Sequence, residues 1–419
     1  MNTYSSYKDS GVEWIGDIPS EWDSLKLKYI FSEKPITHNT ELNCGSISFG
    51  RVVFKDNDKV PISTKKSYQE VLEGEYLINP LNLNYDLKSL RIGLSDIDVV
   101  VSSGYIVIKN RIEISKSYYK WLLHIYDILH MKLLGSGVRQ TISFNHISNS
   151  ILTYPPLHEQ QQISDYLDYK TLKIDTLIKK TQQKIELLKE QRISLINTTV
   201  TKGLNPNVEM KDSGIEWIGE IPSGWNVTKL KYTCNITYGI SPPDTTYNDK
   251  GRGEILINGP VEYSKEDFGY TRSTKWTTDP KKFTEKGSLL FCLRGSTTGR
   301  MNITHDYVSI GRGVCSIISK ESQWFMIYSM FIVRDYIQGE ITGSTFPSVT
   351  KDDVDNYFIC TPPQQEQQQI VDYLDKETTK IDKLIDTETK RIVLLKEYRQ
   401  SLISEVVTGK VDVRDEVLV

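Results

Sequence analysis

The sequence has little cysteine, and the cysteines are not clustered. Its 419 residues include five cysteines, which lie far apart and never in a C-x-x-C spacing. An odd number of distant cysteines is a poor basis for a disulfide framework, and zinc-binding cysteines usually come in close pairs. The six histidines form no H-E-x-x-H pattern or other ligand spacing. We therefore expect reduced, buried thiols and no metal site.

The sequence also lacks a long apolar run. No stretch approaches the roughly 18 apolar residues of a membrane-spanning helix. The start, MNTYSSYKDSG, has neither the charged nor the apolar region of a secretory signal. These absences predict a soluble, cytoplasmic protein.

Positive charge is not in excess. The chain has 51 Lys and Arg residues against 54 Asp and Glu residues, a formal net charge of -3. This argues against a protein that coats nucleic acid through bulk positive potential. Sequence-specific DNA binding stays possible, because base readout needs only a few arginines and polar groups aimed at base edges, with some phosphate contacts.

Catalytic motifs are missing as well. RGSTTGR at residues 294–300 has three residues between its glycines, followed by Arg-Met, whereas a nucleotide-binding Walker loop has four, followed by Lys-Ser or Lys-Thr. NPLN at 79–82 and SPPD at 241–244 lack the aromatic fourth residue of an amino-methyltransferase loop, and no glycine-rich turn precedes them. Both are expected to be ordinary turns. We expect no catalytic residue and no cofactor in this chain.

What the chain does contain is an internal repeat. KDSGVEWIGDIPSEW at residues 8–22 returns as KDSGIEWIGEIPSGW at 211–225. The other repeated stretches are PPLHEQQQI from Pro155 with PPQQEQQQI from Pro362, and SLINTTVTKG from Ser194 with SLISEVVTGK from Ser401. The copies are offset by 203 residues at the first pair and by 207 at the others. One unit of roughly 200 residues is therefore used twice, which is a duplication and not a solenoid of short periods.

Each copy ends in a segment that predicts a long helix. Residues 157–199 contain neither proline nor glycine, and their apolar residues recur at steps of four and three, as in a coiled-coil seam. The second copy keeps this pattern, and prolines stand before each segment and a glycine after it, as at helix ends. The residues predicted to pack the two helices against each other, antiparallel, are Ile174, Ile178, Ile185, Leu188, Ile381, Ile385, Ile392 and Leu395.

The segments between, about 30–154 and 233–361, have a different character. Short β-branched and aromatic runs, such as YIVIK at 105–109 and SLLFCL at 288–293, are separated by Gly, Asn, Asp and Ser. One helical stretch interrupts each segment. Two compact domains of helices and strands are expected. They differ from each other far more than their flanks do, which suits an asymmetric, two-part target.

The chain resembles the specificity subunits of type I restriction-modification systems over nearly its whole length. The resemblance lies in the order domain, helix, domain, helix, in the repeated stretches quoted above and in the ending EVVTGKVDVRDE from Glu405. The resemblance implies an α+β fold with internal duplication and pseudo-two-fold symmetry. Two globular α/β target-recognition domains, each reading half of a split double-stranded DNA sequence, would be separated by two long antiparallel coiled-coil helices. The helices would set the spacing and dock two modification (methyltransferase) subunits, which restriction (translocase/endonuclease) subunits join.

S-adenosylmethionine, ATP and magnesium would belong to those partner subunits. Two other classes stay open from the residues: a coiled-coil scaffold that joins partner proteins without DNA readout, and a self-sufficient methyltransferase-nuclease, against which the missing donor motif argues. The predicted boundaries are 1–154 for the first recognition domain, 155–203 for the first spacer helix, 204–210 for a linker, 211–361 for the second recognition domain, 362–411 for the second spacer helix and 412–419 for a tail.

In the family, polar loops of each recognition domain face the DNA. In the second domain the candidates are Arg294, Ser296, Thr297, Thr298 and Arg300, with Gly343, Ser344, Thr345 and Phe346 before the second helix. In the first domain they are Asn79, Asn82, Asn84, Lys88 and Arg91, with Ser136, Arg139 and Gln140 before the first helix.

Overall fold

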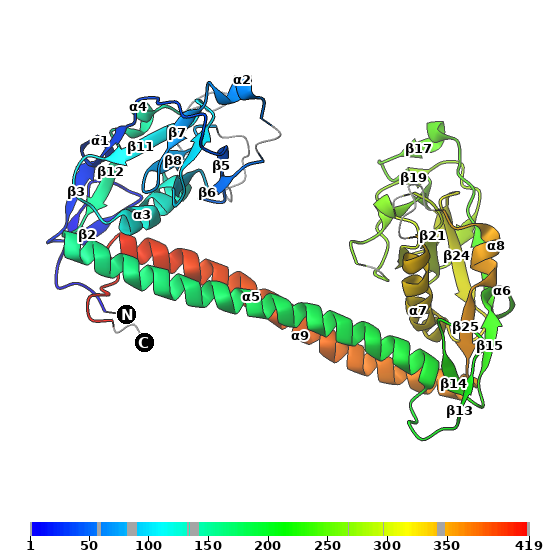
Figure 1. Ribbon diagram of the computed structural model, residues 1–419. Coiled ribbons are helices and arrows are strands. Elements are labelled where there is room, and N and C mark those ends of the chain that lie inside the picture. Colours follow the sequence, from blue (N-terminus) through cyan, green and yellow to red (C-terminus); the bar gives the residue numbers. More distant parts are fainter. Residues whose placement is uncertain are drawn as a thin grey trace. The chain divides into compact units, whose positions relative to one another are not determined.

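The computed structural model describes residues 2–56, 60–81, 90–131, 134, 142–266, 268–295, 297–341 and 348–416. It forms two compact units: unit 1 is Met1–Gln182 with Lys390–Val419, and unit 2 is Gln183–Thr389. Each unit contains one domain of helices and strands and parts of two long helices, α5 (Leu157–Lys202) and α9 (Gln364–Val407) (Figure 1). Each long helix therefore begins in one unit and ends in the other.

The domain of unit 1 is built on a four-stranded antiparallel sheet of order β4-β11-β8-β9. Its strands are β4 (Phe31–Glu33), β8 (Tyr76–Ile78), β9 (Ile92–Leu94) and β11 (Ile106–Asn110). Successive side chains of a strand point to opposite faces. Tyr76 and Ile78 accordingly pack with helix α3 (Lys116–Leu129), whereas Leu77 packs on the other face with a cluster of valines. The sheet is thus covered on both faces.

Shorter elements complete unit 1. The antiparallel pairs are β1 (Tyr7–Asp9) with β2 (Asp17–Pro19), β3 (Asp23–Lys26) with β12 (Ile151–Tyr154), β5 (Gly45–Ser48) with β6 (Arg51–Phe54), and β7 (Gln69–Val71) with β10 (Val99–Val101). The short helices are α1 (Leu27–Ile30), α2 (Ile62–Lys65) and α4 (Phe144–Ile147). Helix α3 begins after Ser115, whose hydroxyl accepts a hydrogen bond from the Tyr118 amide, the usual cap at a helix start.

The domain of unit 2 repeats this sheet and adds a second one. The repeated sheet has the order β16-β24-β21-β22, followed by helix α7. These elements are β16 (Cys234–Tyr238), β21 (Leu289–Cys292), β22 (Met301–Ile303), β24 (Val314–Ser319) and α7 (Gln323–Ile341). The second sheet, of order β17-β19-β18-β23-β20, contains the parallel pair β18 with β23. Its strands are β17 (Tyr247–Asn248), β18 (Glu254–Ile257), β19 (Trp276–Thr277), β20 (Phe283–Thr284) and β23 (Val308–Ile310).

The remaining elements of unit 2 flank these sheets. They are the antiparallel pairs β13 (Met210–Asp212) with β14 (Glu220–Pro222) and β15 (Asn226–Lys229) with β25 (Phe358–Thr361), the helices α6 (Leu230–Thr233) and α8 (Lys351–Asn356), and the 3-10 turns η3 (Asp244–Thr246) and η4 (Pro260–Glu262). The described part of unit 1 has no five-stranded sheet. The two copies therefore share a frame, made of the repeated segments at residues 8–22 and 211–225 and the long helices α5 and α9, but their domains are unlike.

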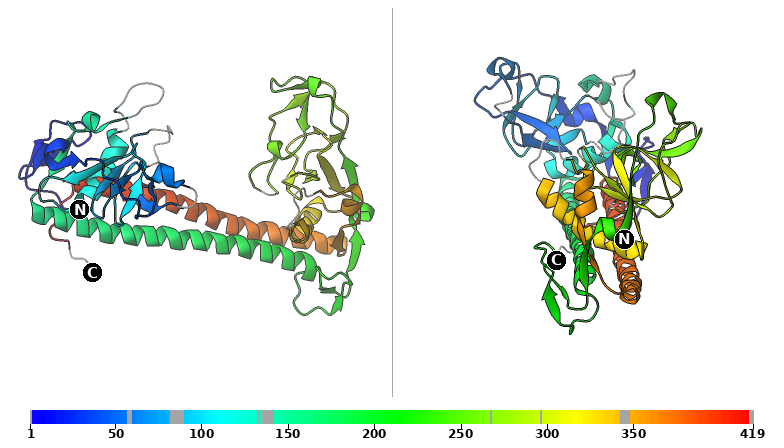
Figure 2. Two further views of the ribbon diagram at one scale, coloured as in Figure 1. Left: turned by 45° about the horizontal axis from the view of Figure 1, so that its top comes forward. Right: turned by 90° about the vertical axis from the view of Figure 1, so that its right-hand side faces the viewer.

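Within each unit the two long helices pack side by side and antiparallel (Figure 2). In unit 1, Arg399, late in α9, donates from Nε to Asp175 Oδ1 at 2.9 Å. In unit 2, Arg192, late in α5, donates from Nε to Asp382 Oδ1 at 2.9 Å. A residue late in one helix thus meets a residue from the first half of the other. The predicted α+β class, internal duplication and long antiparallel helices are confirmed.

The seam between the helices is partly polar. Thr171, Thr181 and Thr378 are buried where the apolar pattern is interrupted, and each hydroxyl donates to the carbonyl four residues earlier, at 2.6 to 2.8 Å. This bond satisfies the hydroxyl inside the helix, so the gap does not leave a buried group unpaired. Of the predicted packing residues, the buried ones are Ile174, Ile185 and Ile381, and the half-buried ones are Ile178, Leu188, Ile385, Ile392 and Leu395.

The repeated segments at residues 8–22 and 211–225, called here the repeated opening, each form a socket for the end of a long helix. In unit 1, α9 ends before Gly409, which has a φ of +74°, and a Cβ there would overlap the Pro19 ring and lie 3.0 Å from the Trp22 ring. In unit 2, α5 ends before Gly203, with a φ of +71°, where a Cβ would lie 3.1 Å from the Trp225 ring. Both tryptophans are buried. The segment occurs twice in the sequence because each copy packs against the end of one long helix, the first against α9 and the second against α5.

The segment after α9 closes unit 1 against the start of the chain. The Asp412 amide donates to the Asn2 carbonyl at 2.9 Å. Arg414 pairs with the Asp412 carboxylate at 2.7 Å, and its guanidinium lies 4.7 Å from the centre of the Tyr4 ring. The Tyr4 hydroxyl donates to the Glu159 carboxylate, and burial together with this carboxylate raises the pKa of Tyr4 above its ordinary value. In unit 1 the start of the chain therefore packs against two segments: the end of α9 and the residues that follow it, 411–414.

The close fit at Gly409 gives a test of the socket. Gly11 has the same φ of +74°, but no atom lies within 4 Å of the position that a Cβ would take there. Gly11→Ala should therefore cost only the left-handed backbone penalty, about 1 to 2 kcal/mol. Gly409→Ala adds overpacking against Pro19 and Trp22, worth about 1 to 3 kcal/mol more. Urea-induced unfolding measures the free energy of unfolding of both variants. Equal losses would show that the helix end is not tightly held.

Candidate nucleic-acid interface

The loop at residues 294–300 closes the β21–β22 hairpin of unit 2. The Cys292 amide donates to the Arg300 carbonyl at 2.9 Å, and the Gly299 amide donates to the Cys292 carbonyl at 2.9 Å. Gly295 and Gly299 have φ values of +92° and +84°, a conformation that residues with a side chain rarely adopt. The two glycines therefore let the chain turn tightly, and the described residues between them sit on a short loop of defined shape.

The two arginines of this loop differ in their surroundings. Arg294 is exposed, and its backbone pairs with that of Ser348 in an isolated antiparallel bridge. Arg300 is half-buried: its Nη2 donates to the Ser264 carbonyl at 2.5 Å, and its guanidinium lies 5.9 Å from the centre of the Tyr263 ring. Arg300 therefore ties the loop to a neighbouring segment, whereas Arg294 presents its guanidinium to solvent.

The threonines of the loop bond within it. The Thr298 hydroxyl donates to the Gly295 carbonyl at 2.8 Å, and Thr297 Oγ1 lies 3.7 Å from Cys292 Sγ. Both threonines are half-buried. They shape the turn, and among the described predicted contacts of this loop Arg294 is the exposed one.

In unit 1 the structure describes two of the predicted contacts, Asn79 and Arg91. Asn79 is half-buried, and its side-chain oxygen accepts from the Leu81 amide at 3.0 Å, which makes it a turn-forming residue. Arg91 is only 3% exposed. Its Nε donates to Asp127 Oδ1 at 3.2 Å and its amide to Asp127 Oδ2 at 2.5 Å. The prediction of a DNA contact is therefore wrong for Arg91, because a guanidinium enclosed with a carboxylate of α3 cannot reach DNA.

The other predicted contacts fall outside the part of the chain that the structure describes, so their roles stay predictions. They are Asn82, Asn84, Lys88, Ser136, Arg139, Gln140, Ser296, Gly343, Ser344, Thr345 and Phe346.

Sequence reasoning missed a cavity in unit 1 where the domain meets its helix pair. It has a volume of about 350 Å³ and is bounded by the β5–β6 hairpin, β9, α3 and both long helices. On its floor Arg399 pairs with Asp175 and lies 5.6 Å from the centre of the Trp121 ring. Asp168 accepts from Trp121 Nε1 at 2.9 Å and from Lys120 Nζ at 2.7 Å. The floor of the cavity thus consists of charged groups that are joined to each other and to Trp121 by ion pairs, hydrogen bonds and a cation–π contact.

Unit 2 has the matching arrangement. A cavity of about 720 Å³ lies where α7 meets the helix pair. Arg192 pairs with Asp382 and lies 5.7 Å from the centre of the Phe331 ring. Arg192 and Asp382 are the repeat counterparts of Arg399 and Asp175 at the offset of 207 residues. The duplication therefore repeats the arginine and the carboxylate at a constant offset, which was the sequence signal that could have revealed the pair, whereas the aromatic rings, Trp121 and Phe331, stand at different positions of the repeat.

The glutamine run at the start of each long helix also has a structural part. Gln160 is buried: its Nε2 donates to the Pro155 carbonyl and its Oε1 accepts from the Ser115 amide, both at 2.9 Å. Gln367 is buried likewise, and its Nε2 donates to the Pro362 carbonyl at 3.0 Å. These two buried glutamines thus fix where the helices begin.

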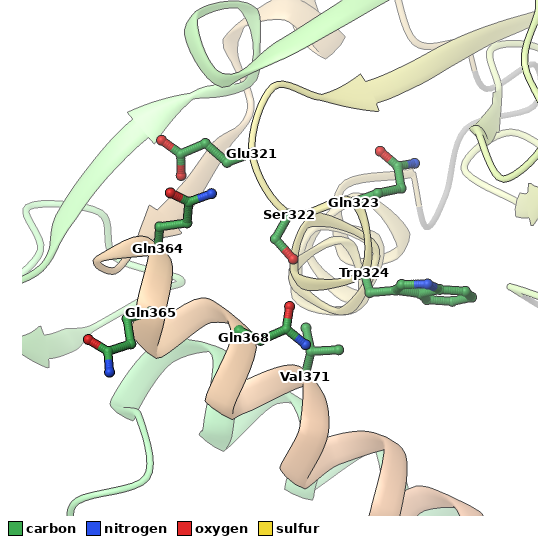
Figure 3. Close-up of a pocket in the computed structure, with 8 residues that line it drawn as sticks. All are labelled: Glu321, Ser322, Gln323, Trp324, Gln364, Gln365, Gln368 and Val371. Atoms are coloured by element: carbon green, nitrogen blue, oxygen red, sulfur yellow. The ribbon is translucent and has the colours of Figure 1, made fainter.

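The neighbouring glutamines of α9 line an open pocket of about 570 Å³ (Figure 3). The pocket lies between the first turns of α9 and the start of α7, and most of its lining groups are amides, a carboxylate and a hydroxyl. Its lining residues are Glu321, Ser322, Gln323, Trp324, Gln364, Gln365, Gln368 and Val371. A polar pocket of this kind suits hydrogen bonding to a partner surface better than enclosure of an apolar molecule.

The cysteines are buried thiols, as the sequence predicts. All five cysteines, Cys44, Cys234, Cys292, Cys315 and Cys360, are free and buried. Burial raises the pKa of the Cys234 thiol to about 11 and that of Cys360 to about 12, so both stay protonated at neutral pH. Within the described ranges, no group of three or more His, Cys, Asp or Glu side chains is arranged to hold a metal ion. Nor does that part of the chain include a helix with the length and apolar character needed to cross a membrane.

Comparison with known proteins gives a consistent result. A family model described as "Type I restriction modification DNA specificity domain" matches residues 19–187 and again 222–397. A putative type I restriction enzyme MjaX specificity subunit of Methanocaldococcus jannaschii is 26% identical, with 96% of each chain aligned. The type I restriction enzyme MjaVIII specificity subunit of the same organism is 22% identical, with 95% of each chain aligned.

Two solved structures share the fold. One, from a study of complex assembly and conformational transition of the type I R-M system, has a TM-score of 0.67 and 19% identity, and the match covers 94% of this chain and 99% of that one. The HsdS subunit from Thermoanaerobacter tengcongensis has a TM-score of 0.54 and 19% identity, with 94% and 98% covered. Because the family model matches once in each copy of the repeat and over most of the chain, the chain belongs to the type I restriction-modification DNA specificity family.

Proposed function

We propose that the chain is the DNA-specificity subunit of a type I restriction-modification complex. It reads a bipartite, asymmetric double-stranded target, one half with the domain of each unit. The observation that carries this proposal is the combination of a repeated frame with two unlike domains, one of which has a five-stranded sheet that the described part of the other lacks. Equivalent places in the frame then present different surfaces, as two different half-sites require.

In unit 2 the loop at residues 294–300 is the proposed reading element. Arg294 is exposed at the end of a strand whose backbone is fixed by the sheet and by the bridge to Ser348. An arginine on a rigid support can place its fork against the N7 and O6 acceptors of a guanine, the commonest specific contact in the major groove. Arg300 supports this loop from behind.

The repeated surfaces are the proposed docking sites for two modification subunits. Gln368 and Gln369 at the start of α9 are exposed, and so are their repeat counterparts in α5, Gln161 and Gln162, so two copies of one partner can bind these glutamines in the same way. Restriction subunits join that core. The partners supply the methyl donor, ATP and magnesium, and this chain contributes recognition without catalysis, in the cytoplasm.

Mapping methylated adenines tests the proposal as a whole. The chain is co-expressed with its modification subunits in a host that lacks such methylation, and the host genome is sequenced for modified adenines. A split motif with two unlike halves and a fixed gap is expected, and none should appear with this chain alone. Methylation by the purified lone chain would contradict the absence of catalysis.

A domain exchange tests the division of labour. Residues 30–154 are replaced with the matching segment of a relative that has a different target. One half of the methylated motif should change while the other half and the gap stay, because each domain has its own core. The mirror exchange of residues 233–361 serves as the control. A change in both halves after either exchange would rule out independent reading.

Arg294→Ala tests the loop. If Arg294 binds a guanine, affinity for the target should fall by about 1 to 3 kcal/mol with relaxed specificity at one position of one half. If it binds phosphate, binding should weaken on every sequence and the salt slope should fall by about one unit. Lys286→Ala, which removes an exposed positive charge at the other end of the same strand, is the matched control and should change neither quantity. Wild-type values for both variants would move the interface off this loop.

A further inference from the structure

The tip of the β5–β6 hairpin in unit 1 has an unusual residue for its geometry. Ser48 pairs with Arg51, so Phe49 and Gly50 form a two-residue turn. Their φ values are +47° and +74°. A turn with two positive φ values favours Asn-Gly, because a bulky side chain is strained in the left-handed region. The side chain of Phe49 is also 80% exposed, so neither the turn nor the core accounts for a phenylalanine here.

The tip is held rigidly, although its side chain is exposed. A Cβ on Gly50 would lie 3.2 Å from Leu90, and a Cβ on Gly93 in β9 would lie 2.8 Å from the Gly50 carbonyl oxygen. The backbone of the turn therefore rests directly on β9, through two glycines that leave no space between the strands. Phe49 is displayed in a fixed direction beside the cavity of unit 1, which it helps to line.

Unit 2 shows what such a residue does when the chain itself provides a partner. Among the described residues, the non-glycine positions with positive φ are Phe49 and Phe268, one in each unit. Phe268 stacks on Phe331 with ring centres 3.8 Å apart and an angle of 10° between the planes. Phe331 is the repeat counterpart of His124, which lines the cavity beside Phe49. In unit 2 the ring of the residue with positive φ is thus stacked on another ring, whereas in unit 1 the ring of Phe49 is exposed to solvent.

The groups around Phe49 favour a nucleic acid as the missing partner. Arg51, the next residue but one, is exposed, and no hydrogen-bond or ion-pair partner of its guanidinium is found among the described residues. Lys120 also lines the cavity, where its ammonium is paired with Asp168, so Arg51 is the cation available beside the ring. An aromatic ring on a rigid tip, with an exposed cation beside it, matches the way proteins stack a ring on a base or insert it at a base step while a cation holds the phosphate.

We propose that Phe49 contacts double-stranded DNA, stacking on or entering between bases of the half-site read by unit 1, and that Arg51 binds the adjacent phosphate. This inference rests on the proposed function and assigns to the hairpin tip a role in the same recognition. In this proposal the strained backbone at Phe49 is kept because the aromatic ring has to project from the tip of the hairpin. An unstrained Asn-Gly turn would have no ring at this position.

Phe49→Asn tests the proposal, because it gives the turn its favoured sequence and removes only the ring. The full chain is assembled with its modification subunits and titrated with a 30-base-pair duplex that carries the methylated motif mapped above. Thermal unfolding should occur at the wild-type temperature or higher, whereas the dissociation constant should rise about 5- to 100-fold. The matched control is Phe54→Thr in the same hairpin, 59% exposed at the end away from the tip, which should bind as the wild type does.

A second readout separates base contact from other roles. With 2-aminopurine placed in turn along the first half-site, the wild-type complex should change its fluorescence at one or two neighbouring positions, and Phe49→Asn should not. Arg51→Ala should weaken binding and lower the salt slope by about one unit.

The outcomes distinguish this inference from the proposed function. If the wild-type complex does not prefer the mapped duplex over a scrambled one, the proposed function fails and the inference with it. If the wild type shows that preference and Phe49→Asn binds equally well, only the inference is overturned. Loss of the modification subunits from the Phe49→Asn complex would also overturn it, since the ring would then be a protein-docking group.

Discussion

The burial of one tryptophan under the end of a long helix is the contact on which each unit depends. Trp22 and Trp225 occupy matching places in the repeated opening, and each meets the glycine where a helix from the other copy ends. Because these glycines have left-handed backbones, the chain turns away as soon as the ring is covered. In each unit the domain, the start of one long helix and the end of the other long helix are thereby joined within one core. A buried glutamine near this core fixes where the starting helix begins.

The duplicated frame and the unlike domains are kept apart by how each is stabilised. The frame uses residues that both copies share: the arginine and carboxylate pairs across the helices and the buried glutamines, at an offset of 207, and the tryptophan sockets, at an offset of 203. The domains use ordinary apolar cores that share one sheet order and differ beyond it. Such a core tolerates change at its surface loops, since stability comes from buried area and not from the loops. Recognition can therefore vary while the frame stays the same.

Sequence reasoning reached the architecture because its signals are local and repeated. The heptad steps, the flanking Pro and Gly residues and the two copies predict the long helices and the duplication, and the structure has both. It failed at Arg91, whose partner Asp127 is 36 residues away on a helix, a distance that no local pattern reveals. The strained turn at Phe49 was also not visible in the sequence, because a turn residue is informative only when its backbone angles are known. The cavities were missed for the same reason: they form where separate segments meet.

Unit 2 is a continuous stretch of chain, Gln183–Thr389, whereas unit 1 needs both ends of the molecule. The core of unit 1 includes Leu402, Ile403 and Val406 from the last turns of α9, together with Val411 and Val413 beyond it. During synthesis the second domain can thus complete its core while the first, although made earlier, still waits for its closing segment. A domain made of one continuous N-terminal stretch can complete its core first, but the core of unit 1 needs its C-terminal segment as well.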